Sequence, residues 1–165
     1  MNPTIDIQRR LELLEITDET RHNIGVFYPV LEMNIGAIVR RFYTHMNTYP
    51  ECRAVFTGHK IDEVLRPRQE RHWLRLFSCR FDDEYVAGAL RIGDVHFQQK
   101  VAPYLYLAGY NYFHCQLIRL CADHFEYSLA MQGLQTAIAR LITLDTELAM
   151  TAYTRAFWNH HQNAA

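Results

Sequence analysis

The chain has few helix-breaking residues and no strand pattern. Its 165 residues include only 7 glycines and 5 prolines, the two residue types that most strongly interrupt helices. No stretch alternates apolar and polar residues in the way that a half-buried strand requires. The sequence therefore predicts an all-α protein of about seven or eight helices, organised as one domain over residues 1–165.

A strong net charge and a long apolar run are also missing. The formal net charge is −1, so no general electrostatic field favours nucleic acid or an anionic membrane surface. No run of about 18 apolar residues occurs, which argues against a membrane span. The 4 cysteines form no Cys-x-x-Cys pair, and nothing at the N-terminus resembles a secretory signal. We therefore expect a cytoplasmic protein without nucleic-acid or membrane partners.

Motifs of the common enzyme classes are absent as well. The sequence contains no glycine-rich phosphate loop, no Gly-x-Ser-x-Gly nucleophile motif and no His-Glu-x-x-His zinc helix. A di-iron bundle needs paired Glu-x-x-His motifs on separate helices, and only residues 19–22 fit that pattern. Cys121 and His124 lie one turn apart, but two ligands do not make a metal site. No catalytic residue is therefore predicted.

Aromatic residues, in contrast, are abundant for a helical protein. They make up 13% of the chain, with 10 tyrosines and 9 phenylalanines, and there are also 9 histidines. One interpretation is that bulky rings fill the gaps between helices. The other is that they line a pocket for a large, flat ligand. Composition alone leaves both interpretations open.

Apolar residues recur at helical spacing through most of the chain. Thr17 or Asp18 is a candidate N-terminal cap, and Pro29 and Pro67 should each kink or restart the helix that contains them. The last helix, roughly thirty residues at about 1.5 Å each, is long for a domain of this size. Such a helix usually packs against a copy of itself or leads into another domain. The expected helices cover residues 5–16, 18–31, 35–46, 50–56, 60–78, 82–100, 103–125 and 128–160.

His96 is the first candidate functional residue, near the C-terminal end of the helix expected over 82–100. A neutral imidazole that binds iron through Nε2 needs an acceptor for its Nδ1–H, and the unpaired carbonyls of a last helical turn can supply one. Val95, Phe97 and Val101 can form apolar walls. These features suit an axial haem ligand, but an ordinary core histidine has the same ones.

Tyr43 is the second candidate, on the apolar face of the helix expected over 35–46. A phenol that points into an apolar pocket needs a partner for its hydroxyl. Dioxygen bound to ferrous haem carries partial negative charge, so a tyrosine O–H in a low dielectric would stabilise it selectively over carbon monoxide. The alternative is a core tyrosine whose hydroxyl reaches water.

Several spaced motifs occur together in residues 71–113. They are His72-Trp73, the turn Phe81-Asp82-Asp83, Arg91-Ile92-Gly93, Val95-His96, Pro103 and Tyr106. In this pattern the chain resembles the sensor globin of the globin-coupled sensor family, and the similarity extends over nearly its whole length. The resemblance implies a globin-like fold with an extra N-terminal helix, a shortened set of helices before the distal helix and two long last helices.

The resemblance also implies a haem b cofactor and assigns roles around it. His96 corresponds to the proximal ligand of the haem iron, and Tyr43 to the distal tyrosine that hydrogen-bonds bound oxygen. Leu65 corresponds to an apolar residue that controls access to the distal side, and Tyr106 to a proximal tyrosine that responds to ligation. The other expected pocket residues are Phe42, Phe56, Val95 and Val101.

The sequence departs from the family pattern at three places. Residues 98–100 are Gln-Gln-Lys where the family often shows Arg-Ile-Gly, and Cys79 stands where a glycine is common. Some members carry a second polar distal residue, for which the sequence offers no clear counterpart, because Arg68 is charged and Pro67 distorts its surroundings. These departures concern the affinity and off-rate of the gas rather than the presence of haem.

Partners are implied as well. By resemblance, the domain would bind O2, and also CO and NO, and signal to a C-terminal output domain. A diguanylate cyclase that makes cyclic di-GMP is the expected output, with methyl-accepting and histidine kinase outputs as alternatives. The last two helices, about 102–125 and 128–160, would form a homodimer interface. The sensor domain itself would not be an enzyme.

Two other interpretations stay open at this point. A haem protein of this kind could turn over oxygen with nitric oxide or peroxide, which would require a reductase partner. A cofactor-free helical dimerisation module would use His96 and Tyr43 only as core residues.

Overall fold

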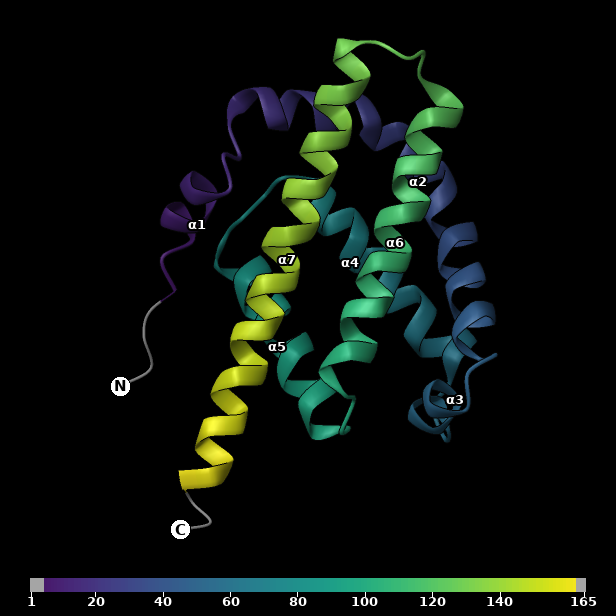
Figure 1. Ribbon diagram of the computed structural model, residues 1–165, viewed down its shortest axis with the longest axis vertical. Helices are drawn as coiled ribbons and strands as arrows, with labels where there is room; N and C mark the ends of the chain where they lie inside the picture. Colours follow the sequence, from purple (N-terminus) through teal and green to yellow (C-terminus); the bar gives the residue numbers. More distant parts are fainter. Residues whose placement is uncertain (1–4, 163–165) are drawn as a thin grey trace.

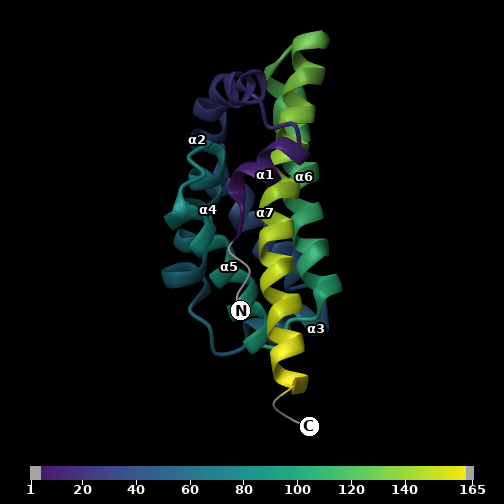
Figure 2. The ribbon, with the colours of Figure 1, turned by 90° about the vertical axis from the view of Figure 1, so that its left-hand side faces the viewer.

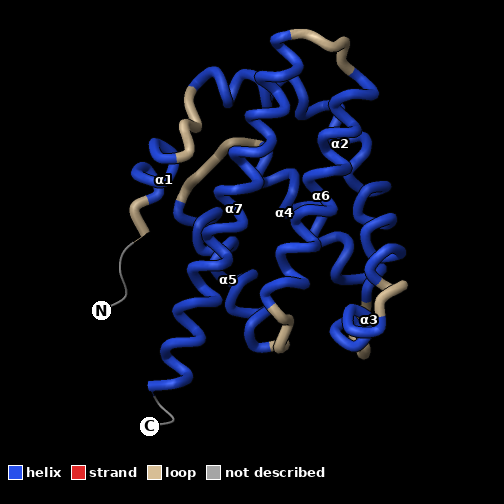
Figure 3. Tube along the Cα trace, viewed as in Figure 1, coloured by secondary structure: helices blue, strands red, loops and turns tan. Residues whose placement is uncertain are grey.

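The computed structural model describes the backbone of residues 5–162 and the side chains of residues 5–155. Every regular element in that part of the chain is helical, and short loops join the helices (Figure 3). The all-α prediction is therefore confirmed. The elements are α1 (Ile7–Leu13), α2 (Asp18–Met46), α3 (Pro50–Phe56), the π-helical turn η1 (Ile61–Leu65), α4 (Arg66–Phe77), α5 (Asp83–Gln98), α6 (Pro103–His124) and α7 (Leu129–Gln162).

α2 is one helix of 29 residues where the sequence predicted two. Thr17 caps it by accepting a hydrogen bond from the Thr20 N–H, within a capping box. The helix does not restart at Pro29 as it could have done; it continues and changes direction along its length (Figure 1). Phe27 and Leu31 on either side of the proline are fully buried. Their packing keeps the helix continuous although the proline removes one backbone hydrogen bond.

Two other prolines stand in the first turn of a helix. Pro50 is the first residue of α3, and Pro67 lies in the first turn of α4. A missing N–H costs no intrahelical hydrogen bond at Pro50, the first residue of its helix. The π-helical turn η1 directly precedes α4, so the helix expected over 60–78 is split close to Pro67.

The turn between α4 and α5 explains why a glycine would suit position 79. Cys79 has a φ of 55°, in the left-handed region that glycine adopts most readily. The chain then enters α5 at Asp82, whose carboxylate accepts a hydrogen bond from the Tyr85 N–H at 2.9 Å. Asp82 is therefore the N-terminal cap of α5.

The helices form two layers, with α6 and α7 in one and α2 and α4 in the other (Figure 2). α5 runs beside α7 and packs closely against it. Gly93 of α5 lies so near the α7 backbone that a Cβ at this position would overlap the carbonyl oxygen of Ala149. The close approach of these two helices places the end of α5, which carries His96, directly on α7.

α7 is the longest helix, with 34 residues. Its C-terminal end extends beyond the neighbouring helices at one end of the molecule (Figures 1 and 2). Among the described residues, no helix has both the length and the apolar character that a bilayer crossing would require. The sequence prediction of an unusually long last helix is therefore confirmed.

Candidate functional site

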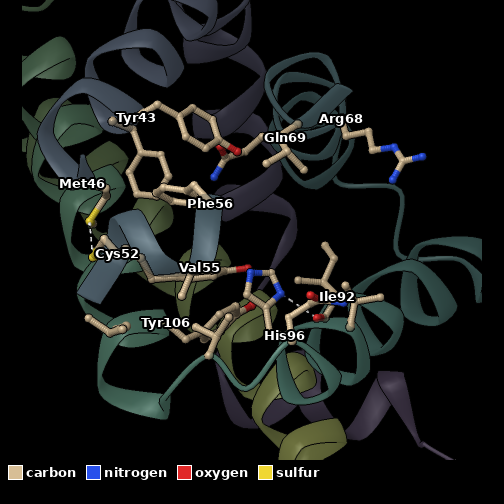
Figure 4. A pocket seen from close by; sticks show the side chains of 18 of the residues that line it. Tyr43, Met46, Cys52, Val55, Phe56, Arg68, Gln69, Ile92, His96 and Tyr106 are labelled. Atoms are coloured by element: carbon tan, nitrogen blue, oxygen red, sulfur yellow. Dashed lines mark hydrogen bonds between the residues drawn. The ribbon is translucent and has the colours of Figure 1, made fainter. Parts of the chain in front are cut away.

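A cavity of about 320 Å³ lies between α2, α3 and α4 on one side and α5 and α6 on the other. Its volume is in the range of small-molecule sites, which are typically apolar with a few polar groups. Figure 4 shows Tyr43 and His96 on opposite sides of this space. All the residues that the sequence predicted around a cofactor belong to its lining: Phe42, Tyr43, Phe56, Leu65, Val95, His96, Val101 and Tyr106.

His96 lies in the last turn of α5, and its ring is fixed by one hydrogen bond. Nδ1 is 2.7 Å from the carbonyl oxygen of Ile92, so Nδ1 carries the proton and Nε2 is the free acceptor. The acceptor is not one of the unpaired carbonyls at the helix end. It lies one turn earlier, because side chains on a helix lean toward its N-terminus. Burial lowers the pKa of His96, although the Ile92 hydrogen bond opposes this effect.

Two tyrosines pack behind His96. The Tyr106 ring makes an edge-on contact with the His96 ring at a centroid distance of 5.0 Å, and it lies 5.6 Å from the Tyr153 ring of α7. The Tyr153 hydroxyl donates to the Val101 carbonyl at 3.0 Å, and the Val101 N–H donates to the His96 carbonyl at 2.9 Å. His96 is thus joined to α7 through both its ring and its backbone.

Tyr43 faces the cavity from α2. Its ring makes edge contacts with the rings of Phe42 and Phe56, at centroid distances of 5.1 and 5.2 Å. Burial raises the pKa of the Tyr43 hydroxyl well above its ordinary value, and the charge of Arg66 offsets only part of that effect. The hydroxyl therefore stays protonated and available as a hydrogen-bond donor.

Gln69 is a second polar side chain on the same side of the cavity, where the sequence offered no clear candidate. It lies on α4 and lines the cavity, and its buried Oε1 has no hydrogen-bond partner among the described residues. In Figure 4 the Gln69 amide lies close to Tyr43, whereas the Arg68 guanidinium is directed away from Tyr43. The run 66–72 is polar at most positions, so its periodicity gave no signal that separates Gln69 from its solvent-facing neighbours.

Polar and charged side chains gather at the rim of the cavity. His59, Arg68 and Gln99 contribute to the lining, and all three are exposed. Val95 also lies at the rim, since 45% of its surface is exposed. The cavity is therefore apolar inside, with one imidazole on one side and hydrogen-bonding groups on the other, and it opens toward a cationic and polar edge.

The donor set around the cavity does not suit a bare metal ion. The described residues contain no group of three or more histidine, cysteine, aspartate or glutamate side chains that could hold one. His96 is a single ligand, and a protein site for a free ion needs several. An iron bound here would have to bring most of its ligands with it.

The chain matches a protein family and is similar to a curated protein. Residues 5–159 match the family model described as Protoglobin. The chain is 28% identical over 165 residues to the heme-based aerotactic transducer HemAT of Halobacterium salinarum, a match that covers 92% of this chain and 33% of that protein. The chain therefore spans about a third of the length of this relative.

Two solved structures have the same architecture. The globin domain of a Geobacter sulfurreducens globin-coupled sensor superimposes with a TM-score of 0.84 at 17% identity, covering 91% of this chain and 99% of that one. The globin domain of E. coli DosC superimposes with a TM-score of 0.70 at 15% identity, covering 90% and 97%. At these identities the two structures establish the fold.

Proposed function

The chain belongs to the protoglobin family and has the fold of the globin domains of globin-coupled sensors, and from this premise we propose that it is a haem-based oxygen-sensor domain. The resemblance predicted from residues 71–113 is thereby confirmed. The observation that carries the proposal is the arrangement of His96, with Nδ1 hydrogen-bonded and Nε2 free, opposite Tyr43 and Gln69. We propose haem b as the cofactor and CO and NO as further ligands.

The residues around the cavity fit a haem. His96 offers the one protein ligand that the iron needs, and the aromatic lining suits the faces of a porphyrin. Gln69 Oε1 and the Tyr106 hydroxyl are buried without a partner among the described residues. Such atoms cost free energy unless something pairs with them, and a cofactor with its gas ligand would bring polar atoms into the cavity. Arg68 and His59 at the rim would receive the two anionic propionates.

On the proximal side, the haem would supply an iron that binds diatomic gases reversibly. His96 would hold that iron through Nε2, while the Ile92 carbonyl keeps the proton on Nδ1 and fixes the plane of the ring. Tyr106 lies against the imidazole and would respond when the His96 ring moves.

On the distal side, three residues would act on the gas. Tyr43 would donate its O–H to a polar diatomic ligand, and this donation favours O2 over CO because O2 accumulates more negative charge. Gln69 would add a second polar group beside Tyr43. Leu65 of η1 would present an apolar side chain that limits the entry of water. Together these groups would set how long O2 stays bound.

α7 is the proposed route of the signal out of the domain. It receives contacts from His96 through Tyr106 and Tyr153, and its end extends away from the other helices (Figure 1). On α6, Tyr104 is 61% exposed and Leu107 is 45% exposed, so an apolar surface is available to a second copy. We propose a homodimer through α6 and α7, and a C-terminal output domain that is a diguanylate cyclase. Packed interfaces of this kind switch between discrete arrangements.

An absorption spectrum of the purified chain after reconstitution with haem tests the proposal. The wild-type chain should show a Soret band that shifts on reduction and again on adding O2 or CO, and His96→Ala should lose most of the bound haem. His124→Ala is the matched control, because the His124 ring makes the same contact, Nδ1 to the Leu120 carbonyl at 3.0 Å, outside the cavity. A wild-type chain without a Soret band, or His96→Ala with the wild-type spectrum, would contradict the proposal.

A further inference from the structure

α7 carries a buried carboxylate, Asp145, at the centre of a polar cluster. Asp145 is 0% exposed. Its Oδ2 accepts from His72 Nε2 at 2.6 Å and from the Tyr110 hydroxyl at 2.5 Å, and its Oδ1 accepts from the Tyr85 hydroxyl at 2.8 Å. An ionised carboxylate can only accept hydrogen bonds, so three donors around it match its chemistry.

The cluster joins four helices. Its members are His72 of α4, Tyr85 of α5, Tyr110 of α6 and Asp145 of α7. Two of them, His72 and Tyr110, also line the cavity. α4 carries Gln69, one turn before His72, and α5 carries His96. One carboxylate therefore contacts both the helix of the distal side and the helix of the proximal side.

The Asp145 cluster is the first of three successive contacts along α5 and α7. Going along both helices in the same direction, Tyr85 meets Asp145, Gly93 meets Ala149, and the loop that follows α5 meets Tyr153 through the Val101 carbonyl. Of these three contacts, the one at Asp145 is the one that also reaches α4, through His72.

Net stability does not explain a carboxylate at this place. A buried ion pair adds little stability over an apolar residue of similar size, because removing the charges from water costs about as much as their attraction returns. Burial alone would lower the pKa of His72, but the charge and hydrogen bond of Asp145 outweigh burial and raise it. Burial would raise the pKa of Asp145, and its three partners outweigh that effect and lower it. Both shifts favour the charged forms of the pair, and the ionised carboxylate has three donors at defined positions.

We propose that Asp145 is a positioning residue of the haem pocket, whose carboxylate fixes the distal helix α4 and the proximal helix α5 relative to α7. The carboxylate acts through two separate hydrogen bonds, which we call the distal arm (to His72) and the proximal arm (to Tyr85). His72 sets the position of α4 and therefore of Gln69, and Tyr85 sets the position of α5 and therefore of His96. This inference rests on the proposed haem function for its spectroscopic test, but not for the test on the haem-free chain described below.

Two vibrational bands separate the two arms. In the reconstituted ferrous protein, the iron–histidine stretching band in the resonance Raman spectrum reports the proximal side. In the CO complex, the C–O stretching band in the infrared reports the polarity of the distal side. The variants are Asp145→Asn, which keeps the size of the side chain and removes its charge, together with Tyr85→Phe and His72→Gln. The matched control is Asp94→Asn, because Asp94 makes a more exposed α5–α7 ion pair with Arg155 at 3.2 Å.

Asp145→Asn should shift or broaden both bands. Tyr85→Phe should move the iron–histidine band and leave the C–O band in place, and His72→Gln should do the opposite. Asp94→Asn should change neither. If Asp145→Asn does not fold, Tyr85→Phe and His72→Gln alone are sufficient to test the inference. Wild-type positions of both bands in Asp145→Asn, or in both single-arm variants, would overturn the inference.

Amide hydrogen exchange on the haem-free chain gives a readout that does not need the cofactor. Asp145→Asn should exchange roughly tenfold faster than the wild type in both α4 and α5, because three donors lose their acceptor. Asp94→Asn should affect α5 alone or neither helix. A wild-type chain that binds no haem would refute the proposed function and leave this result standing. Unchanged exchange in both helices would overturn the role of Asp145, whatever the chain binds.

Discussion

The two sides of the cavity are built in different ways. On the proximal side, α5 is held against α7 along its length, by a glycine contact at Gly93 and by the Tyr153 hydrogen bond beyond its end. On the distal side, α3, η1 and α4 begin without a side-chain cap, and η1 contains no buried residue. The proximal side is a close contact between two helices, whereas the distal side includes the short segments α3 and η1 in addition to α2 and α4.

This difference suggests a division of labour. A segment with few buried contacts and no caps opens and adjusts at a low free-energy cost, which suits the proposed entry of a gas on that side. A helix packed backbone to backbone cannot absorb a displacement by local adjustment. A movement of His96 would therefore pass to α7, while changes around Leu65 would stay local.

Gly93→Ala should have the largest effect on stability, because it disrupts the close contact between α5 and α7. The added Cβ would overlap the Ala149 carbonyl, so α5 must move away from α7. We expect the free energy of unfolding of the haem-free chain to fall by about 2 kcal/mol, measured by urea denaturation.

Gly88→Ala is the control on the same helix. A Cβ at Gly88 meets nothing within 4 Å, so alanine should raise stability by up to about 1 kcal/mol through helix propensity. Equal effects of the two substitutions would show that α5 and α7 are not in close contact at Gly93.

Tyr43→Phe tests the distal side, and its effect should appear in ligand kinetics rather than in folding. A hydrogen bond to a charged acceptor contributes about 1.5–3 kcal/mol, so O2 should dissociate roughly tenfold to a hundredfold faster. The CO dissociation rate should change much less. Tyr112→Phe is the control, since this ring packs against Phe42 at a centroid distance of 5.7 Å but is not part of the cavity lining. Equal acceleration for both gases would mean that Tyr43 gates access instead of donating a hydrogen bond.

Substitutions in the loops on the two sides of the cavity should also differ in their effect on the free energy of unfolding. Gly58, after α3, has a φ of +80°, and Lys100, after α5, has a φ of 57°. Gly58→Ala should cost about 1 kcal/mol, since only glycine adopts this region freely. Lys100→Gly should change the free energy of unfolding by less than about 0.5 kcal/mol, because relief of backbone strain is offset by the greater freedom of glycine in the unfolded chain. Urea denaturation measures both, and a large loss for Lys100→Gly would show that its side chain matters.

Local signals in the sequence were enough for most of the fold. The cap at Thr17, the acidic start of α5 at Asp82 and the prolines at positions 50 and 67 act within one helical turn, so they can be recognised without the rest of the structure. The family resemblance then brought His96 and Tyr43 together, which are 53 positions apart. Periodicity could not have done so.

What the sequence did not reveal depends on long-range packing. Pro29 does not end α2, because buried neighbours hold the helix together across it. Gln69 faces inward from a run of mostly polar residues, and only the placement of α4 shows which of them meets the cavity. In the sequence, Asp145 is indistinguishable from the other polar positions of a long helix, because its partners lie 35 to 73 residues away.

The smallest expected effect is on the pH dependence of stability, in which His72→Gln and Tyr85→Phe should differ. The pKa of His72 is raised above the ordinary value of 6.5 by Asp145. A raised pKa means that the charged pair contributes its full stability below about pH 6.5 and loses it as the pH rises through the pKa of the folded protein. The difference in unfolding free energy between the wild type and His72→Gln should therefore shrink as the pH is raised from 6 upward.

Tyr85→Phe should differ from the wild type by a constant amount over the same range, because burial holds the pKa of Tyr85 well above it. A difference for His72→Gln that grows with pH would show that the imidazole is neutral in the folded protein and that only the proximal arm is tied to α7 by charge.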